Sequence, residues 1–230
     1  MFALLMAACK KDTYFLEANI LPQVLDMSGI PVLYDRIKND LSDILLTKDN
    51  KVLNELMDAM KLLQQADNLG SIMKFDISEV TREIIVRRLA EYKTMGEMPI
   101  IIRNFLSAFR LILALTDKYT GVVANPPYMG AGNMNPELTK YVKDNYEDGK
   151  SDLFSVFMYV SIQLLAPQGK LGMINMQSWM FLSSFEKLRK FFLDNYQIDN
   201  MLHLGPRTFD EISGEIVQNT AFVILSLIHI

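Results

Sequence analysis

The sequence of 230 residues has few of the residues that covalent cross-links and metal sites require. It contains a single cysteine, Cys9, which excludes a disulfide within the chain and therefore a disulfide-stapled secreted scaffold. One cysteine and two histidines also leave few ligands for zinc or iron, so no metal site is expected. No apolar run approaches the roughly 20 residues that span a bilayer, and we expect no membrane partner and a cytoplasmic location.

The chain also has no excess of positive charge. The chain has 23 Lys and Arg against 27 Asp and Glu, which gives a formal net charge of −4 at pH 7. Such a balance provides no overall basic field for binding nucleic acid. Hydrophobic residues make up 50% of the chain, which is sufficient for a packed core and excludes a disordered chain.

The N-terminal string MFALLMAACKK is compatible with two structures. The apolar residues 2–8 before Cys9 could form a lipoprotein signal or an amphipathic helix. A secretory signal carries positive charge ahead of its apolar segment, whereas Lys10 and Lys11 follow that segment here. We therefore favour the helix.

Residues 1–116 have a mostly helical pattern. Apolar residues recur at helical spacing between residues 51 and 69, and Gly70 interrupts the pattern. Ser78 predicts the capped start of a helix that extends to residue 93. The apolar run at residues 100–115 predicts a further helix that is buried nearly all round.

Residues 117–230 change to alternating strands and helices. We predict strands at residues 120–124, 170–175, 198–204 and 220–225, and helices at residues 152–166 and 185–195. This alternation indicates an open α/β sheet. Ligands bind such sheets beyond the carboxyl ends of the strands, so Asn125, directly after the first strand, is expected at a functional site.

The string Asn125-Pro126-Pro127-Tyr128 is the most informative feature of the chain. Two prolines in a row are often no more than a rigid turn. Their position at the end of a strand favours a functional role instead. The string resembles motif IV of the amino-group methyltransferases that use S-adenosylmethionine, in particular the adenine-N6 DNA methyltransferases.

Later segments of the chain extend the resemblance. Three segments look like the corresponding parts of the large bacterial type IIG-like and BREX PglX-type adenine methyltransferases, namely residues 151–166, 169–175 and 178–181. Three further segments are most similar to the PglX type, namely residues 201–205, 209–211 and 217–222. The resemblance implies a partial Rossmann-like class I methyltransferase sheet, made of its later strands and preceded by the helical segment.

The resemblance also implies a role for each residue of the string. The lone pair of an adenine amine is delocalised into the ring, and two acceptors on its hydrogens would free that pair for attack. Asn125 would supply one acceptor with its side chain, and Pro126 the other with a carbonyl that the fixed φ of proline holds in place. Pro127 and Tyr128 would contact the adenine, with Tyr128 stacked on a base flipped out of the duplex. Phe209 is either a second stacking aromatic or a packing residue.

The pattern that would bind the cofactor is missing from this chain. In this fold, S-adenosylmethionine requires a Gly-rich turn after the first strand and an acidic residue after the next one. No glycine before Gly121 lies in a Gly-x-Gly pattern, so we assign no cofactor-binding residue. We expect residues 117–230 to be the truncated catalytic half of a longer methyltransferase domain, with residues 1–116 inserted before the motif. The chain alone is expected to be inactive.

Three functions compete. The first is S-adenosylmethionine-dependent adenine-N6 methylation of double-stranded DNA in phage defence or restriction-modification, with other phage-defence proteins as partners. The second is a protein-glutamine or RNA methyltransferase, because these enzymes also use Asn-Pro-Pro-Tyr, although the long helical stretch before the motif speaks against them. The third is a noncatalytic helical interaction protein in which the string is only a turn.

Other side chains receive structural roles. Trp179 and Phe181 could form a wall of the base or cofactor pocket, but we favour core positions for both. Asp152 is predicted to cap the helix that starts there. His203 is predicted to be a strand residue rather than a ligand. A solvated helix face is predicted for three basic residues, which are Lys187, Arg189 and Lys190.

Overall fold

A computed structural model describes residues 24–25, 41–95, 100–205 and 218–227 of the chain. The chain divides into two compact units, which are Met1–Asp67 with Asp76–Leu113 and Asn68–Phe75 with Ala114–Ile230. The predicted helix at residues 2–8 lies outside the described residues. Within the described ranges, no helix combines the length and the apolar character needed to cross a membrane.

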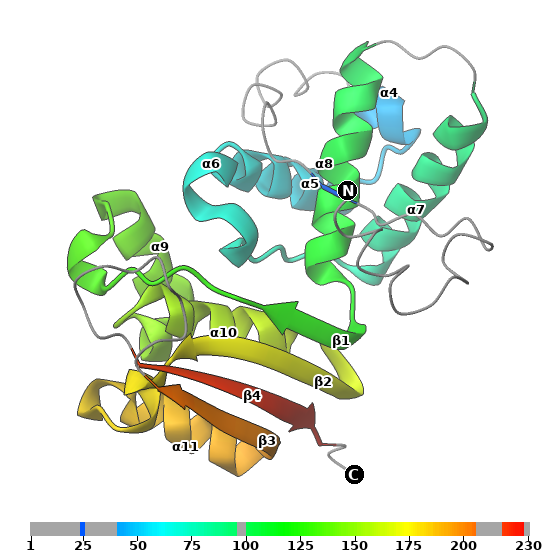
Figure 1. The fold of residues 1–230 in the computed structure, drawn as a ribbon. Helices are drawn as coiled ribbons and strands as arrows, with labels where there is room; N and C mark the ends of the chain where they lie inside the picture. The colour runs from blue at the N-terminus through cyan, green and yellow to red at the C-terminus, as the bar shows by residue number, and fades with distance from the viewer. Residues whose placement is uncertain (1–23, 26–40, 96–99, 206–217, 228–230) are drawn as a thin grey trace. The chain divides into compact units, whose positions relative to one another are not determined.

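The first half of the described chain is helical, as predicted. Its main helices are α4 (Leu41–Leu45), α5 (Asn50–Leu63), α7 (Glu79–Thr94) and α8 (Ile100–Thr116) (Figure 1). The structure has two helices where a single helix was predicted over residues 51–69. The first, α5, ends at Leu63, and the second, α6 (Ala66–Leu69), follows it. The N–H groups of Gln64 and Gln65 bond to carbonyls three residues back, and this tightening ends α5.

Glu55 of α5 fastens the start of α7. Ser78 caps α7 as predicted, since its hydroxyl oxygen accepts a 3.4 Å hydrogen bond from the N–H of Thr81. The carboxylate of Glu55 accepts hydrogen bonds of 2.8 Å from both the N–H and the hydroxyl of Ser78. It also accepts one of 2.5 Å from the hydroxyl of Thr81. The two helices are therefore joined at the first turn of α7.

The second unit contains a four-stranded sheet among its described residues, with the strand order β1-β2-β4-β3 (Figure 1). The strands are β1 (Tyr119–Ala124), β2 (Leu165–Met176), β3 (Tyr196–Gly205) and β4 (Asn219–Ser226). β1 and β2 run parallel, whereas β4 lies between β2 and β3 and runs antiparallel to both. The prediction of an α/β sheet after a helical segment is confirmed.

The helix predicted at residues 152–166 is shorter and β2 is longer than expected. The helix, α10, spans Leu153–Gln163, and β2 already begins at Leu165. Tyr119 pairs with Leu165, and its N–H donates to the carbonyl of Leu164 at 2.8 Å. Pro167 lies in the irregular stretch of this pairing, where a missing N–H breaks no ladder hydrogen bond. The pairing with β1 therefore extends the strand past the proline.

One helix of the second unit was not predicted. This helix, α9 (Pro136–Asn145), is capped by Asn135, whose side chain accepts a 2.8 Å hydrogen bond from the N–H of Leu138. Leu138 and Val142 lie one turn apart and are buried. The signals of a capping asparagine, a proline at the first position and an apolar pair were present, but the preceding Gly/Asn/Pro-rich loop obscured them.

The helices α10 and α11 (Glu186–Asn195) pack against one face of the sheet. The core on this face combines residues of both helices and of the strands: Phe154, Met158, Leu171, Met173, Leu188, Phe192, Phe222 and Ile224. Trp179 belongs to this core, as predicted. Phe181 does not, because 69% of it is exposed, and its predicted core role is wrong. It follows the short 3-10 helix Gln177–Met180, whose turn buries Trp179 and leaves Phe181 outside.

Candidate active site

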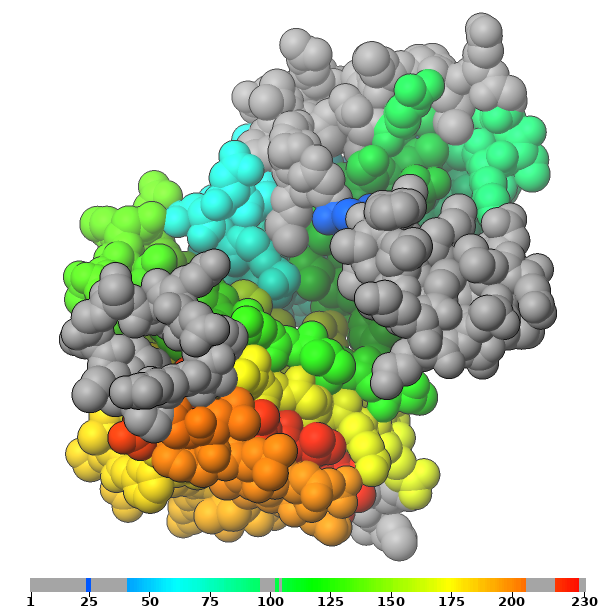
Figure 2. Space-filling view, viewed as in Figure 1, coloured from blue at the N-terminus to red at the C-terminus, as the bar shows by residue number. Residues whose placement is uncertain are grey.

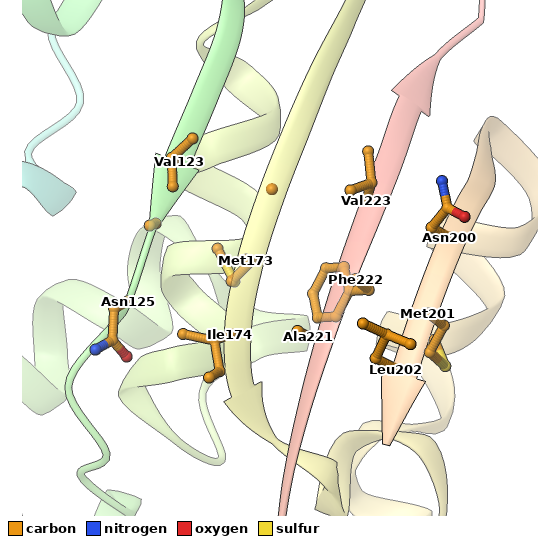
Figure 3. Close-up of a pocket in the computed structure, with 12 residues that line it drawn as sticks. Val123, Asn125, Met173, Ile174, Asn200, Met201, Leu202, Ala221, Phe222 and Val223 are labelled. Atoms are coloured by element: carbon orange, nitrogen blue, oxygen red, sulfur yellow. The ribbon is translucent and has the colours of Figure 1, made fainter. Parts of the chain in front are cut away.

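A pocket of about 400 Å³ lies over the sheet on the face that α10 and α11 leave free. All four strands contribute to its lining, which consists of Val123, Ala124, Gly172, Met173, Ile174, Asn200, Met201, Leu202, Ala221, Phe222, Val223 and Asn125 (Figure 3). In Figure 2 the strands form adjoining bands in the order green, yellow, red and orange. Asparagine side chains are the polar members of this otherwise apolar lining.

Asn125 lies at the rim of the pocket, where β1 ends (Figure 3). Side chains alternate along β1, so Val122 and Ala124 pack on the core while Val123 is 89% exposed on the pocket side. Asn125 is itself exposed. Its predicted position directly after the strand is confirmed, and its predicted chemical role is taken up below.

The rest of the string leads from the rim back into the protein. Pro126 is buried, Pro127 is exposed, and Tyr128 is half-buried against the core. The hydroxyl of Tyr128 donates a hydrogen bond of 2.9 Å to the side-chain oxygen of Asn219, 91 residues away in the sequence. Its ring meets that of Phe154 edge-on, with centroids 6.2 Å apart and planes at 86°. Burial, and secondarily the charge of Asp152, raises the pKa of Tyr128, so at neutral pH the hydroxyl keeps its proton.

Asp152 holds the loop that follows the string. It caps α10 as predicted, since its carboxylate accepts a 3.2 Å hydrogen bond from the N–H of Phe154. The same oxygen accepts one of 3.0 Å from the N–H of Met129. The N–H of Leu153 in turn donates to the carbonyl of Met129 at 2.9 Å. The residue after Tyr128 is therefore tied to the start of α10 on both its N–H and its carbonyl.

The ends of β2, β3 and β4 meet in a polar cluster next in sequence to Asn219, the hydrogen-bond partner of Tyr128. Gln177, just after β2, donates from its backbone N–H to the carbonyl of Gln218 at 2.9 Å, and the two side-chain amides also bond to each other. The Nε2 atom of His203 lies 2.5 Å from the side-chain oxygen of Gln177. His203 lies in β3, as predicted for a strand residue. Asn219, which begins β4 next to this cluster, is only 1% exposed.

Sequence reasoning missed Asn219 as a neighbour of the motif, and it missed the pair of Gln177 and Gln218. Nothing local could have revealed them, because the pairing of β4 with its neighbours brings Asn219 to Tyr128 and Gln218 to Gln177. Their one sequence signal is that polar amides stand at the ends of otherwise apolar strands. Phe209, the second predicted aromatic, lies outside the described residues.

The three basic residues of α11 differ from the predicted solvated face. Arg189 is half-buried and donates hydrogen bonds of 2.8 Å and 2.6 Å to the carbonyls of Trp179 and Leu182. The predicted solvated role is therefore wrong for Arg189, which holds the turn after β2. Lys187 pairs with Asp148 across 3.2 Å, and Lys190 is exposed.

The lining of the pocket does not by itself suit S-adenosylmethionine. Ribose hydroxyls in this class of fold are held by a carboxylate, and none of the described residues that line the pocket is Asp or Glu. Across the described ranges, no group of three or more His, Cys, Asp or Glu side chains is arranged to hold a metal ion. The described residues thus present an apolar pocket with an amide at its rim rather than a complete cofactor site.

Comparison with known proteins identifies the family. Residues 32–209 match the Eco57I restriction-modification methylase family, and the chain belongs to it. It is 40% identical over 187 residues to the adenine-specific methyltransferase BrxX of Escherichia coli O9:H4 (strain HS), a match that covers 78% of this chain and 15% of that protein. It is 32% identical over 232 residues to the adenine-specific methyltransferase PglX of Lacticaseibacillus casei (strain Zhang), covering 97% of this chain and 19% of that protein. The resemblance inferred from the motif is confirmed.

The chain spans less than a fifth of the length of these two relatives. Among solved structures, a class I S-adenosylmethionine-dependent methyltransferase from Listeria monocytogenes matches with a TM-score of 0.39 and 14% identity. That match covers 90% of this chain and 72% of the other.

Proposed function

We propose that this chain provides the adenine-binding side of an active site that methylates N6 of adenine in double-stranded DNA, in a restriction-modification or phage-defence system. The observation that carries the proposal is the position of Asn125, exposed at the rim of a pocket where β1 ends. Membership of the Eco57I family supports the class of reaction. The relatives BrxX and PglX, both named as adenine-specific methyltransferases, support the choice of adenine.

Asn125 and Pro126 act on the amine of the base. The side-chain oxygen of Asn125 and the carbonyl of Pro126 accept the two amine hydrogens, which draws the nitrogen toward a tetrahedral geometry and frees its lone pair. Pro126 is buried, and its ring restricts φ, so its carbonyl needs no reordering when the base arrives. The two acceptors are adjacent in sequence and therefore approach the same small group.

Tyr128 and Pro127 hold the flipped base. Extruding an adenine from the duplex costs a few kcal/mol of stacking and pairing, and stacking on an aromatic ring offsets roughly 1–3 kcal/mol of that cost. We assign this stacking to Tyr128, with Pro127 at its edge and Phe209 as a second aromatic contact.

The methyl donor and most of the DNA surface belong, in this proposal, to the longer enzyme. S-adenosylmethionine is the donor we propose, bound by residues beyond this chain, because the lining that the structure describes offers no carboxylate for its ribose. The division into a helical segment at residues 1–116 and a catalytic half at residues 117–230 belongs to the same proposal. We also propose that the enzyme associates with other phage-defence proteins and is located in the cytoplasm.

The direct test is Asn125→Ala in the full-length enzyme. We expect methyl transfer to fall by at least about 100-fold, as for the loss of one preorganised group at a developing charge, with the fold unchanged. N6-methyladenine is measured in host DNA, and circular dichroism checks the fold. Asn145→Ala, an exposed asparagine at the end of α9, is the control and should methylate as the wild type does. Wild-type turnover by Asn125→Ala would falsify the proposal, and methyl groups found on RNA or glutamine instead would refute the DNA substrate.

A further inference from the structure

The hydroxyl of Tyr128 has a fixed partner that the stacking role does not require. A phenylalanine could stack on a base equally well, yet this hydroxyl is bonded to the side-chain oxygen of Asn219 at 2.9 Å. Building on the proposed function, we infer that Asn219 is a positioning residue, which sets the tilt of the Tyr128 ring so that its face meets the flipped adenine.

Asn219 is well placed to act as an anchor. It is 1% exposed and begins the central strand β4, where it pairs with Met176 of β2 and Gly205 of β3. Because strands on both sides hold its backbone, its side chain has little freedom to follow a moving tyrosine. The tyrosine therefore adapts to the asparagine and not the reverse.

Two further contacts complete the orientation of the ring. The edge-on contact with Phe154, at 86° between planes, restrains rotation about the long axis of the ring. Asp152 holds the N–H of Met129 at 3.0 Å and so restrains the backbone directly after Tyr128. With the hydroxyl, the ring edge and the backbone each restrained, one ring orientation is selected before the base arrives. Preorganisation of this kind lowers the ordering cost at the moment of binding.

The donor direction of the bond is maintained across the neutral range. Burial raises the pKa of Tyr128, and the charge of Asp152 adds to the effect. The phenol therefore stays protonated and donates, while the side-chain oxygen of Asn219 accepts.

The test is a double-mutant cycle in the full-length enzyme, with Tyr128→Phe and Asn219→Ala alone and combined. Single-turnover methyl transfer is measured on a duplex that carries the enzyme's own site, taken from the positions of N6-methyladenine in host DNA. Loss of one neutral hydrogen bond corresponds to a rate that is lower by about 3- to 10-fold. We expect this loss in each single variant and no greater loss in the double variant, because both changes remove the same bond.

A fluorescence readout separates positioning from a general loss of structure. An emissive base, 2-aminopurine, replaces the target adenine, and its emission is quenched when it stacks on an aromatic ring. We expect brighter emission from the saturated complexes of Tyr128→Phe and Asn219→Ala than from the wild type. Thr220→Val is the matched control, since it changes the next residue of β4 and removes only the 3.4 Å bond from its hydroxyl to Asn175. It should leave both the rate and the emission unchanged.

Losses that multiply in the double variant would overturn the inference, as would wild-type rate and emission in Tyr128→Phe. Tyr128→Phe keeps the ring and opens no buried cavity. It therefore tests the positioning role even if Asn219→Ala does not fold. A different result would contradict the proposed function, namely an Asn125→Ala enzyme that remains active. An inactive Asn125→Ala enzyme with fully active Tyr128→Phe and Asn219→Ala variants refutes the positioning role alone.

Discussion

At the scale of single residues, Asp152 shows how one carboxylate can serve the helix and the site together. Its oxygen receives the N–H of Phe154 in α10 and the N–H of Met129 beside the motif. Burial nevertheless raises the pKa of Asp152 above its ordinary value of 3.8, and the backbone hydrogen bonds only partly oppose the shift. The folded state therefore binds the proton of this group more readily than the unfolded state does.

The raised pKa predicts a specific dependence of stability on pH. The contribution of Asp152 to the free energy of unfolding is fully present below its unfolded pKa and is lost as the pH rises through its folded pKa. Asp152→Asn keeps the acceptor oxygen but does not titrate. The stability difference, wild type minus variant, should therefore fall as the pH rises from 3.8 through the raised pKa. Urea unfolding of both proteins across this range measures it, and a difference that grows with pH contradicts the assignment.

Gly169 is required by a close approach of two strands. A Cβ atom built on it would lie 2.9 Å from the carbonyl oxygens of both Ala166 and Tyr119, which are backbone atoms and cannot rotate away. We predict that Gly169→Ala lowers the free energy of unfolding by about 1–3 kcal/mol, measured by urea unfolding. Gly121→Ala is the control, because nothing lies within 4 Å of its added carbon. Equal stability of the two variants would show that β2 moves freely there.

At the scale of elements, the connection between α5 and α7 depends on one partly buried acceptor, the carboxylate of Glu55. Burial would raise the pKa of Glu55, but the hydrogen bonds from Thr81 and Ser78 outweigh it and lower the pKa below 4.5. The ionised carboxylate thus stabilises the folded state. Its contribution is present above the unfolded pKa and is lost as the pH falls through the lowered one.

We therefore predict that Glu55→Gln destabilises the protein at pH 7 by about 1.5–3 kcal/mol, the usual contribution of hydrogen bonds to a charged group. The penalty should shrink as the pH falls below 4.5 toward the lowered pKa of Glu55. Denaturant unfolding at several pH values measures it. Glu83→Gln, at an exposed position of α7, serves as the control and should change stability little. A penalty that does not depend on pH would mean that the charge is unimportant.

At the scale of the whole molecule, the composition and the pocket agree on what this chain contains. The Asn-Pro-Pro-Tyr turn and its anchors are present in the second unit. The sequence lacks a Gly-rich turn ahead of the motif, and no carboxylate lines the pocket among the residues with a described position. The net charge of −4 is compatible with a proposed role on DNA, since the chain spans less than a fifth of its two long relatives. The basic DNA-binding surface is expected in the remainder of such an enzyme.

This division predicts weak cofactor binding. The 230-residue chain should bind S-adenosylmethionine at least about 100-fold more weakly than the full-length enzyme. The proposed division places outside this chain the charged and backbone groups that would hold the cofactor, and hydrogen bonds to charged groups each contribute roughly 1.5–3 kcal/mol. Isothermal titration calorimetry of both proteins measures the ratio. Equal affinities would show that residues of this chain form the cofactor site after all.

Local features were predictable because their causes are local. The cap of Ser78 on α7, the cap of Asp152 on α10, and the end of β1 just before Asn125 all depend on residues within a few positions of one another. The boundary between α10 and β2 could not be predicted from local sequence, because pairing with Tyr119 decides where β2 begins. Arg189 was misassigned for a similar reason, since its carbonyl partners belong to a turn whose path depends on tertiary packing.

The motif and its likeness to adenine methyltransferases followed from the order of residues along the chain, since four consecutive residues after a strand form their own local geometry. The antiparallel insertion of β4 between β2 and β3 followed only from the folded structure. Strand pairing is a competition among distant segments with similar apolar patterns, and short-range periodicity does not distinguish among them. That pairing is what carries Asn219 across 91 positions to the hydroxyl of Tyr128.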